Sequence, residues 1–207
     1  MSDARAFLDT AYDLDSGEKT HAYYSQWAKT YDQELIGNGY ASPARTAQAM
    51  AGAVEDVGAA LLDVGCGTGL SGEALKDVGF TVLDGSDFSP EMLALAATKN
   101  VYRDLKQSDL AQPIPAQPGE YANVTAVGVF SPGHAPAATI QHVVSLLPAK
   151  GCFGFTLNDH ALEDPSYQDV IDALCEASVV ETAVRERGPH LPKIGLEAIV
   201  YVLRKLS

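Results

Sequence analysis

The sequence predicts an α/β fold in which a mostly parallel sheet carries helices on both faces. From about residue 61 onward, strand-like and helix-like segments alternate, which is the pattern of a parallel sheet. In addition, the first apolar segment, residues 61–64, ends in a glycine-rich stretch that leads into a helix-like segment at residues 70–78. A strand, a tight loop and a helix start in this order are typical of a nucleotide-binding edge.

The remaining elements of the predicted sheet follow in order. We expect strands at residues 80–83, 101–107, 123–129 and 152–157, and helices at residues 90–98, 137–147 and 169–177. Ser89 and Pro90 predict the cap and first turn of the helix at 90–98. Residues 179–186 and 198–203 are expected to form a hairpin, because the turn dipeptides Gly188-Pro189 and Pro192-Lys193 lie between them.

Residues 1–58 show no strand alternation and are expected to form a helical cap. Helices are predicted at residues 4–14, 23–36 and 42–57, the last with Ser42 as N-cap and Pro43 in its first turn. No linker separates this region from the glycine-rich stretch. We therefore expect one domain, residues 1–207, made of a cap (1–58) and a Rossmann-like core (59–207).

Composition restricts the function classes. With 207 residues the chain is long enough for one domain with a sizeable core. The 27 acidic and 14 basic residues give a net charge of −13, which argues against a nucleic-acid partner. Neither a membrane span nor a secretion signal is recognisable, so we expect a cytoplasmic protein without a membrane partner. The three widely spaced cysteines predict free thiols and no metal site.

The spacing of the glycines distinguishes between nucleotide cofactors. The sequence gives G-x-G-x-G at Gly65, Gly67 and Gly69, whereas the dinucleotide fingerprint is G-x-G-x-x-G. Leu70 stands where that third glycine would fall. Asp63, at the end of the first strand, would repel a pyrophosphate and would suit a cationic ligand such as an ammonium or sulfonium. A nicotinamide-dependent oxidoreductase is therefore disfavoured.

Two motifs resemble those of the class I S-adenosylmethionine-dependent methyltransferases: Asp63-Val64-Gly65-Cys66-Gly67-Thr68-Gly69 the first motif, and the string from Gly85 to Leu93 the second. The resemblance implies a seven-stranded sheet of order 3-2-1-4-5-7-6, with strand seven antiparallel. It also implies S-adenosylmethionine as cofactor and S-adenosylhomocysteine as product.

The resemblance further implies which residues bind the cofactor. Asp87 would bind the ribose hydroxyls, with Asp84 as the competing acid. The other implied contacts lie in the glycine stretch and at the ends of later strands: Asp63, Gly65, Cys66, Gly67, Gly69, Phe88, Met92, Ser108, Asp109, Leu110, Val127 and Gly128. For Met92 the alternative is plain core packing, and for Asp109 it is a turn or capping role. Cys66 is expected as a small residue that fits the loop.

The substrate side is less clearly marked. The string Val127 to His134 resembles the smaller Williams-Beuren-region methyltransferase-like group, which makes His134 a candidate general base or substrate contact; the alternative is a loop histidine that caps the next helix. In the cap, Trp27 and Tyr31 are the preferred cofactor contacts, against the alternative that these aromatics pack on the sheet. The candidates for the substrate pocket are Tyr23, Tyr24, Phe130, Asn158 and His160; Asn158 and His160 could equally form a turn.

Methyl transfer from S-adenosylmethionine to a small-molecule acceptor is the leading hypothesis. The alternative is a non-catalytic S-adenosylmethionine-binding or regulatory protein, because it would share every motif above. His190, in the final turn, is expected at the surface. The oligomeric state is left open.

Overall fold

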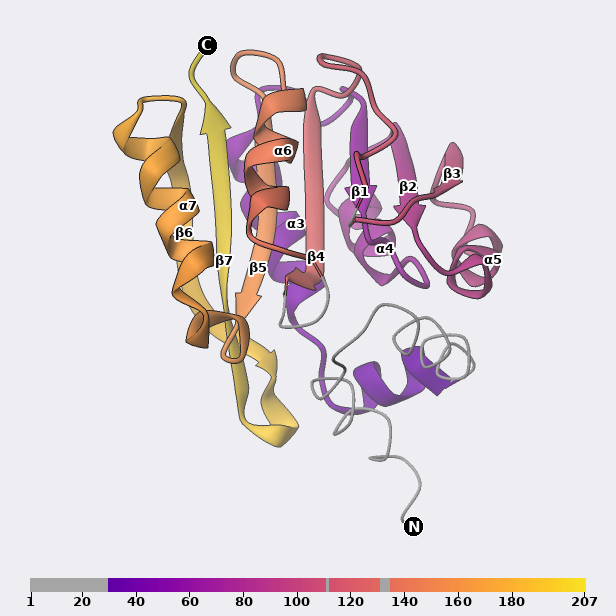
Figure 1. Ribbon diagram of the computed structural model, residues 1–207. Helices are drawn as coiled ribbons and strands as arrows, with labels where there is room; N and C mark the ends of the chain where they lie inside the picture. Colours follow the sequence, from indigo (N-terminus) through magenta and orange to yellow (C-terminus); the bar gives the residue numbers. More distant parts are fainter. Residues whose placement is uncertain (1–29, 111, 131–134) are drawn as a thin grey trace.

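A computed structural model describes residues 30–110, 112–130 and 135–207. Seven strands form one sheet of order β3-β2-β1-β4-β5-β7-β6, and β7 runs antiparallel to both of its neighbours (Figure 1). This order confirms the predicted topology. The strands are β1 Leu61–Val64, β2 Leu83–Asp87, β3 Asp104–Gln107, β4 Asn123–Phe130, β5 Cys152–Asn158, β6 Val180–Leu191 and β7 Leu196–Lys205.

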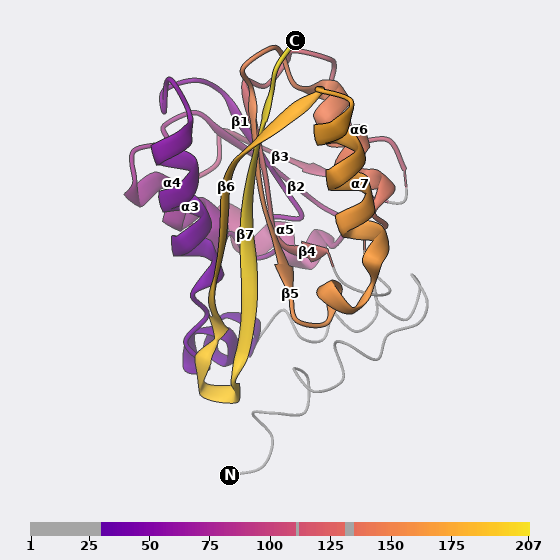
Figure 2. The ribbon, with the colours of Figure 1, turned by 90° about the vertical axis from the view of Figure 1, so that its left-hand side faces the viewer.

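Helices cover both faces of the sheet. They are α3 Ser42–Ala53, α4 Leu70–Asp77, α5 Pro90–Thr98, α6 Ala138–Leu146 and α7 Pro165–Glu176, and residues 30–37 are also helical. Figure 2 shows α3 and α4 on one face and α6 and α7 on the other. Each pair encloses its own apolar core: Met50, Leu75 and Phe80 belong to the first, and Ile140 and Ile171 to the second. Burial on both faces explains why β5 is apolar along most of its length.

The second strand lies later in the sequence than expected. The prediction placed it on the apolar residues 80–83, whereas β2 spans Leu83–Asp87 and pairs in parallel with β1. Its sequence, Leu-Asp-Gly-Ser-Asp, is poor in strand formers, so pairing between β1 and β3 fixes it there. The shift makes Asp87 the last residue of the strand. It also places Asp84 within the strand, where its carboxylate binds Arg103 (2.5 Å).

Ser89 and Ser42 were both predicted as N-caps, and only Ser89 is one. Ser89 is the N-cap of α5, and its hydroxyl accepts a hydrogen bond from the Met92 N–H (3.2 Å). Ser42 is no cap, because it lies within α3 and its buried hydroxyl contacts His190 Nδ1 (2.7 Å). The same contact makes the expectation of a surface His190 wrong: only 4% of this residue is exposed.

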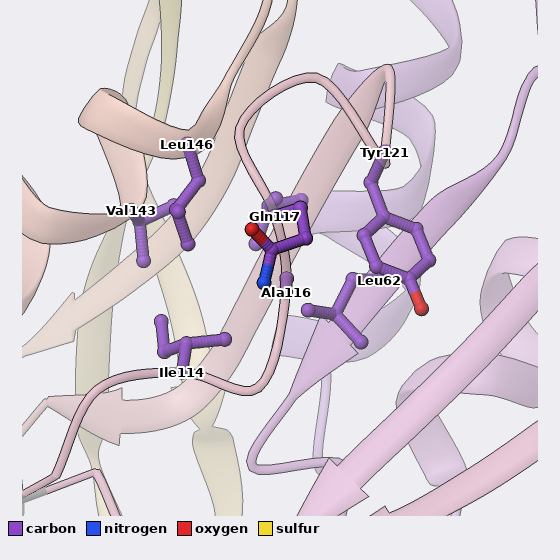
Figure 3. Close-up of a pocket in the computed structure, with 8 residues that line it drawn as sticks. Leu62, Ile114, Ala116, Gln117, Tyr121, Val143 and Leu146 are labelled. Atoms are coloured by element: carbon purple, nitrogen blue, oxygen red, sulfur yellow. The ribbon is translucent and has the colours of Figure 1, made fainter.

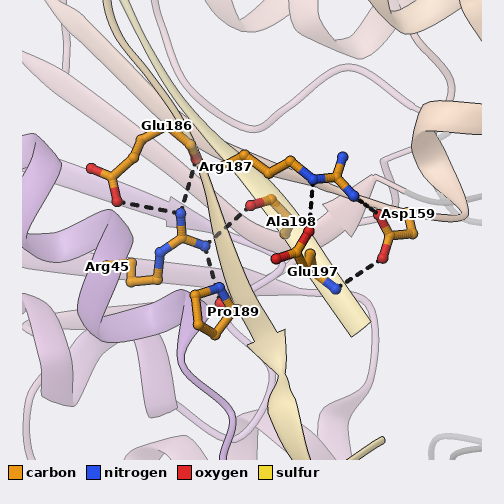
Figure 4. Close-up of polar contacts among 7 residues, drawn as sticks. All are labelled: Arg45, Asp159, Glu186, Arg187, Pro189, Glu197 and Ala198. Carbon is orange, nitrogen blue, oxygen red and sulfur yellow. Dashed lines mark hydrogen bonds and ion pairs between the residues drawn. The ribbon is translucent and has the colours of Figure 1, made fainter. Parts of the chain in front are cut away.

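The terminal hairpin is longer than predicted and is fixed from two sides (Figure 4). Gly188 and Pro189 lie inside β6, and the turn is formed by residues 192–195. On one side, Arg45 of α3 donates hydrogen bonds to three carbonyls of the hairpin, those of Glu186, Pro189 and Ala198. Since α3 also packs in the core of the sheet, it belongs to one of the two helical layers.

On the other side of the hairpin, Arg187 binds Asp159, in the loop after β5, and Glu197, in β7 (Figure 4). The division of the chain into a cap and a core stays a prediction, since residues 1–29 lie outside the described part. None of the described helices has the length and apolar character that a membrane crossing needs.

The buried His190 predicts acid sensitivity. Burial lowers its pKa to about 4, so the unfolded chain takes up the proton first as the pH falls below 6.5. The stability that the neutral, buried His190 contributes is complete above pH 6.5 and is lost as the pH falls towards 4. Between pH 7 and pH 5 it should amount to about 2 kcal/mol of the free energy of unfolding. Urea unfolding of the wild type and of His190→Gln at both pH values measures it.

The His190→Gln variant should lose less stability over this pH range than the wild type, whatever its absolute stability. Equal pH dependence in the two proteins would contradict the assignment to His190.

Candidate functional site

Three left-handed glycines build the loop between β1 and α4. Gly65, Gly67 and Gly69 have φ angles of 66°, 54° and 92°, a region that side-chain-bearing residues rarely adopt. A Cβ on Gly65 would also stand 2.5 Å from Val129, whereas a Cβ on Gly67 would meet no atom within 4 Å. Gly65 is thus required by packing. Gly67 instead keeps open the space beside the loop.

Asp87 joins this loop to the neighbouring strand end. Its carboxylate accepts hydrogen bonds from the N–H groups of Gly67 and Ser89, each at 2.9 Å. Its carbonyl accepts one from the Ser108 N–H (2.9 Å), which attaches the segment after β3. Burial raises the pKa of Asp87, and the backbone donors oppose the rise. Each carboxylate oxygen can accept a further hydrogen bond, so Asp87 retains capacity for a ligand.

Asp63 lies beneath the same loop and is fully buried. Three hydroxyl groups donate to its carboxylate: Ser71 (2.5 Å) and Tyr102 (2.7 Å) to Oδ2, and Thr125 (2.8 Å) to Oδ1. Burial raises the pKa of this carboxyl, and the three donors act against that rise. No ion pair with a lysine, arginine or histidine reaches Asp63 in the part of the chain that the structure describes.

A small cleft opens above the loop, at the carboxyl ends of the parallel strands. Ligands of open α/β sheets bind at this edge. The lining comes from the glycine loop, the start of α4, the end of β4 and the region before α3: Tyr31, Tyr40, Pro43, Gly65, Cys66, Gly67, Thr68, Leu70, Ser71 and Val127. The pKa of the Cys66 thiol lies well above its usual range because the residue is buried, so Cys66 is unsuited to act as a nucleophile.

The helix of residues 30–37 is attached to the outer side of the loop. Figure 1 shows it beyond the carboxyl ends of the parallel strands. The Thr68 hydroxyl donates to the Asp32 carboxylate, and Lys99 binds both Asp32 (2.9 Å) and Glu73 (2.6 Å). These contacts hold Tyr31 at the cleft, where the sequence analysis expected a cofactor contact.

The other expected cofactor residues fall into two groups. Phe88, Ser108, Asp109 and Leu110 lie in the segments that follow β2 and β3. The Ser108 N–H donates to the Asp87 carbonyl, but neither Asp87 nor any of these four is among the described residues that line the cleft. Met92 is almost fully buried on α5 and does not line the cleft, which matches the core-packing alternative. Asp84, the competing acid, also lies apart from the cleft, since Arg103 and Tyr121 occupy its carboxylate.

The substrate candidates are not brought together. Phe130 is 1% exposed and packs against Phe153, Phe155 and Tyr167, so it is a core residue and no pocket residue. Its position follows from an irregular register in β4 between Ala126 and Phe130. The expected roles of Tyr23, Tyr24, Trp27 and His134 lie outside the described residues and stay predictions.

Asn158 and His160 occupy the turn that follows β5. The Asn158 side chain is buried and accepts a hydrogen bond from the Ala161 N–H (2.9 Å), which is the turn role left open by the sequence. His160 is half-buried beside it. Neither residue lines the cleft above the glycine loop.

A second, small cavity lies under the segment between β3 and β4 (Figure 3). Its walls are mostly apolar and come from Leu62, Ile114, Ala116, Gln117, Tyr121, Val124, Val143 and Leu146. It offers no carboxylate or backbone cradle to a charged ligand. Within residues 30–110, 112–130 and 135–207, no cluster of His, Cys, Asp and Glu is placed to hold a metal ion.

Several residues of the site were missed by the sequence analysis, among them Pro43, Thr68 and Leu70 in the lining of the cleft. Tyr40 lines the cleft, and Ser71, Tyr102 and Thr125 surround Asp63. Ser71 could have been suspected from the sequence, since it lies in the first turn of the helix that follows the glycines. Tyr102 and Thr125 come from distant segments, and only the fold brings them to Asp63.

Comparison with known proteins gives consistent matches. A family model described as a methyltransferase domain matches residues 61–151. Human methyltransferase-like protein 27 is 34% identical over 147 residues, which cover 69% of this chain and 60% of that protein. The 18S rRNA (guanine(1575)-N(7))-methyltransferase of Saccharomyces cerevisiae is 43% identical over 61 residues, 30% of this chain and 22% of that enzyme. The chain thus spans less than two thirds of either relative.

Among solved structures, the fold matches a methyltransferase chain solved in complex with the Haloferax volcanii Trm112 methyltransferase activator. The TM-score is 0.68 at 16% identity, over 90% of this chain and 97% of that chain. At this identity the likeness concerns the fold alone.

These matches correct the expectation about partners. The sequence analysis excluded a nucleic-acid partner because of the net charge of −13. Relatives from yeast, cattle and mouse are nevertheless named as 18S rRNA methyltransferases, and the structural neighbour was solved with a protein activator. The exclusion is therefore wrong. Net charge describes the whole surface, and it does not determine whether one region binds RNA or protein.

The family resemblance noted in the sequence is confirmed by the strand order, by the family model and by the relatives. Residues 61–151 carry a methyltransferase domain, and the strand order is that of the class I S-adenosylmethionine-dependent methyltransferases.

Proposed function

We propose that the cleft above the glycine loop binds S-adenosylmethionine and that the chain transfers its methyl group to a small-molecule acceptor. The observation that carries the proposal is the open side of Gly67: a Cβ added there would have no atom of the described residues within 4 Å, although the Gly67 N–H is held by Asp87. The loop thus leaves room for a ligand directly beside the carboxylate that could bind its ribose. Two buried carboxylates, Asp63 and Asp87, suit a ligand that combines a cation with hydroxyl donors.

The protein's part in the reaction is binding and alignment. When bound, the cofactor supplies an electrophilic methyl group on a sulfonium. Asp87 would accept hydrogen bonds from the ribose hydroxyls, and Tyr31 and Tyr40 would close the cleft against water. Val127 and Gly128, at the end of β4, would border the acceptor. The N–H of Gly128 donates to Thr156 Oγ1 (2.9 Å), which fixes that strand end.

The lining of the cleft supports a small acceptor. None of the described residues that line it is a lysine or an arginine, the residues with which proteins usually contact a phosphate backbone. The aromatic and aliphatic side chains Tyr31, Tyr40, Leu70 and Val127 suit a compact, partly apolar molecule.

A screen for S-adenosylhomocysteine production tests the function. The chain is incubated with S-adenosylmethionine and with either a metabolite library or total RNA. Turnover with a metabolite supports the proposal, whereas turnover with RNA alone would overturn the small-molecule acceptor. Binding of the cofactor without turnover on any acceptor would favour the non-catalytic alternative.

Gly67→Ala should remove cofactor binding at a small cost in stability. The added methyl group meets no protein atom but stands beside the cleft, where the cofactor is proposed to lie. We expect at least a tenfold loss of S-adenosylhomocysteine affinity in calorimetry, and about 1–2 kcal/mol of destabilisation from the left-handed backbone.

Gly119→Ala is the matched control, because Gly119 is also left-handed (φ 78°), also has no atom within 4 Å of a Cβ, and does not line the cleft. It should share the loss of stability and keep the affinity. Wild-type affinity in Gly67→Ala would contradict the placement of the cofactor.

Asp87→Asn should weaken cofactor binding through the ribose. Loss of the carboxylate removes a charged acceptor, which is worth on the order of 1.5–3 kcal/mol when its partner is left unsatisfied. Asp84→Asn provides the control, since it removes a second buried carboxylate from the same strand. We expect Asp84→Asn to lower the melting temperature and to leave the affinity for S-adenosylhomocysteine unchanged. The reverse pattern would transfer the ribose role to Asp84.

A further inference from the structure

Tyr102 occupies a slot that three glycines leave open. A Cβ on Gly72, in α4, would lie 2.4 Å from the Tyr102 hydroxyl oxygen. A Cβ on Gly85, in β2, would lie 3.2 Å from the ring, and one on Gly69 would lie 3.3 Å from it. The missing side chains let the ring pass under the glycine loop. The slot directs the hydroxyl to Asp63 Oδ2, at 2.7 Å.

The carboxylate that receives this hydroxyl is separated from the cleft by one side chain. Ser71 donates to the same oxygen of Asp63 at 2.5 Å, and Ser71 itself lines the cleft. The described residues offer Asp63 three hydroxyl donors and no ion pair. The Asp63 carboxylate, which lies behind Ser71, would therefore attract a cation bound in the cleft. Its negative charge is not paired with any described basic side chain.

We propose that Tyr102 is a positioning residue that holds the Asp63 carboxylate under the glycine loop, so that the cleft discriminates between the cationic methyl donor and its neutral product. The inference rests on the proposed function of the same cleft. S-adenosylmethionine carries a sulfonium and S-adenosylhomocysteine a neutral thioether, so the two ligands differ by one methyl group and one positive charge. A buried carboxylate near the sulfur favours the first of them.

The physical basis is the competition between burial and hydrogen bonding at Asp63. Burial favours the neutral acid, and each hydroxyl donor favours the carboxylate. Tyr102 can only donate in this contact, since burial and the nearby Asp63 hold the pKa of its phenol well above the usual value. The other titratable groups that act on this cluster are the Cys66 thiol and the Asp87 carboxylate. Removal of the Tyr102 hydroxyl weakens the charge on Asp63 and leaves the ring in its slot.

The test compares the two ligands on two variants. Calorimetry gives the dissociation constants of S-adenosylmethionine and S-adenosylhomocysteine for the wild type, Tyr102→Phe and Thr125→Val. We expect Tyr102→Phe to weaken S-adenosylmethionine binding by roughly threefold to tenfold and S-adenosylhomocysteine binding by less than about twofold. Thr125→Val removes a different donor from the same carboxylate, on β4, and should shift the ratio in the same direction.

Tyr121→Phe is the matched control, because it removes a buried tyrosine hydroxyl that donates to Asp84, away from the cleft (2.9 Å). It should leave both affinities unchanged. Equal losses for both ligands in Tyr102→Phe would show a purely structural role and overturn the inference, as would no change in either. If the wild type binds neither ligand, the proposed function fails as well, so the two failures are distinguishable.

Discussion

The chain has to leave a buried strand, turn sharply and begin a helix between Val64 and Leu70, and the rest of the site depends on this constraint. The turn is possible because three of its residues adopt left-handed backbone angles. It brings the backbone N–H of Gly67 to Asp87 and the hydroxyl of Ser71 to Asp63. One local backbone path therefore orients two acids from two different strands towards the same space. The cleft is a consequence of that path together with the helix of residues 30–37, which closes its outer side.

Features encoded within a few consecutive residues could be predicted from the sequence. The glycine spacing, the acid before it and the Ser89 cap of α5 are local, and the structure contains each of them. The strand order could also be predicted, but only through the resemblance to a family; alternation alone indicated a parallel sheet without giving the order. The predictions of the helices at 90–98 and 137–147 were accurate to about a residue because caps and prolines limit their ends.

Features that depend on contacts between distant segments could not be predicted. The strand β2 is polar and forms because β1 and β3 lie on its two sides. His190 is buried and contacts the hydroxyl of Ser42, 148 residues away. Tyr102 reaches Asp63 through a slot formed by two other elements and the glycine loop. Phe130 was expected at the pocket because it follows the end of a strand, but an irregularity in β4 turns it into the core. The prediction that the chain has no nucleic-acid partner failed for a different reason: it used the net charge of the whole chain, which does not describe any one region of the surface.

The irregular register of β4 also divides the strand into a buried, regularly paired part and a part that reaches the cleft. Up to Ala126, each residue of β4 is buried and keeps its register with β5, so most changes there disturb the core. After Ala126 the regular pairing is interrupted, and Val127 and Gly128 are more exposed than their neighbours before pairing resumes at Phe130 in a shifted register. Val127 can vary at this point without shifting the strand as a whole. Gly128 cannot, because its φ of 71° is left-handed and a Cβ on it would stand 2.6 Å from the Tyr40 hydroxyl oxygen. One strand therefore combines a section that holds the sheet together with a cleft-lining residue, Val127, that lies outside the regular pairing.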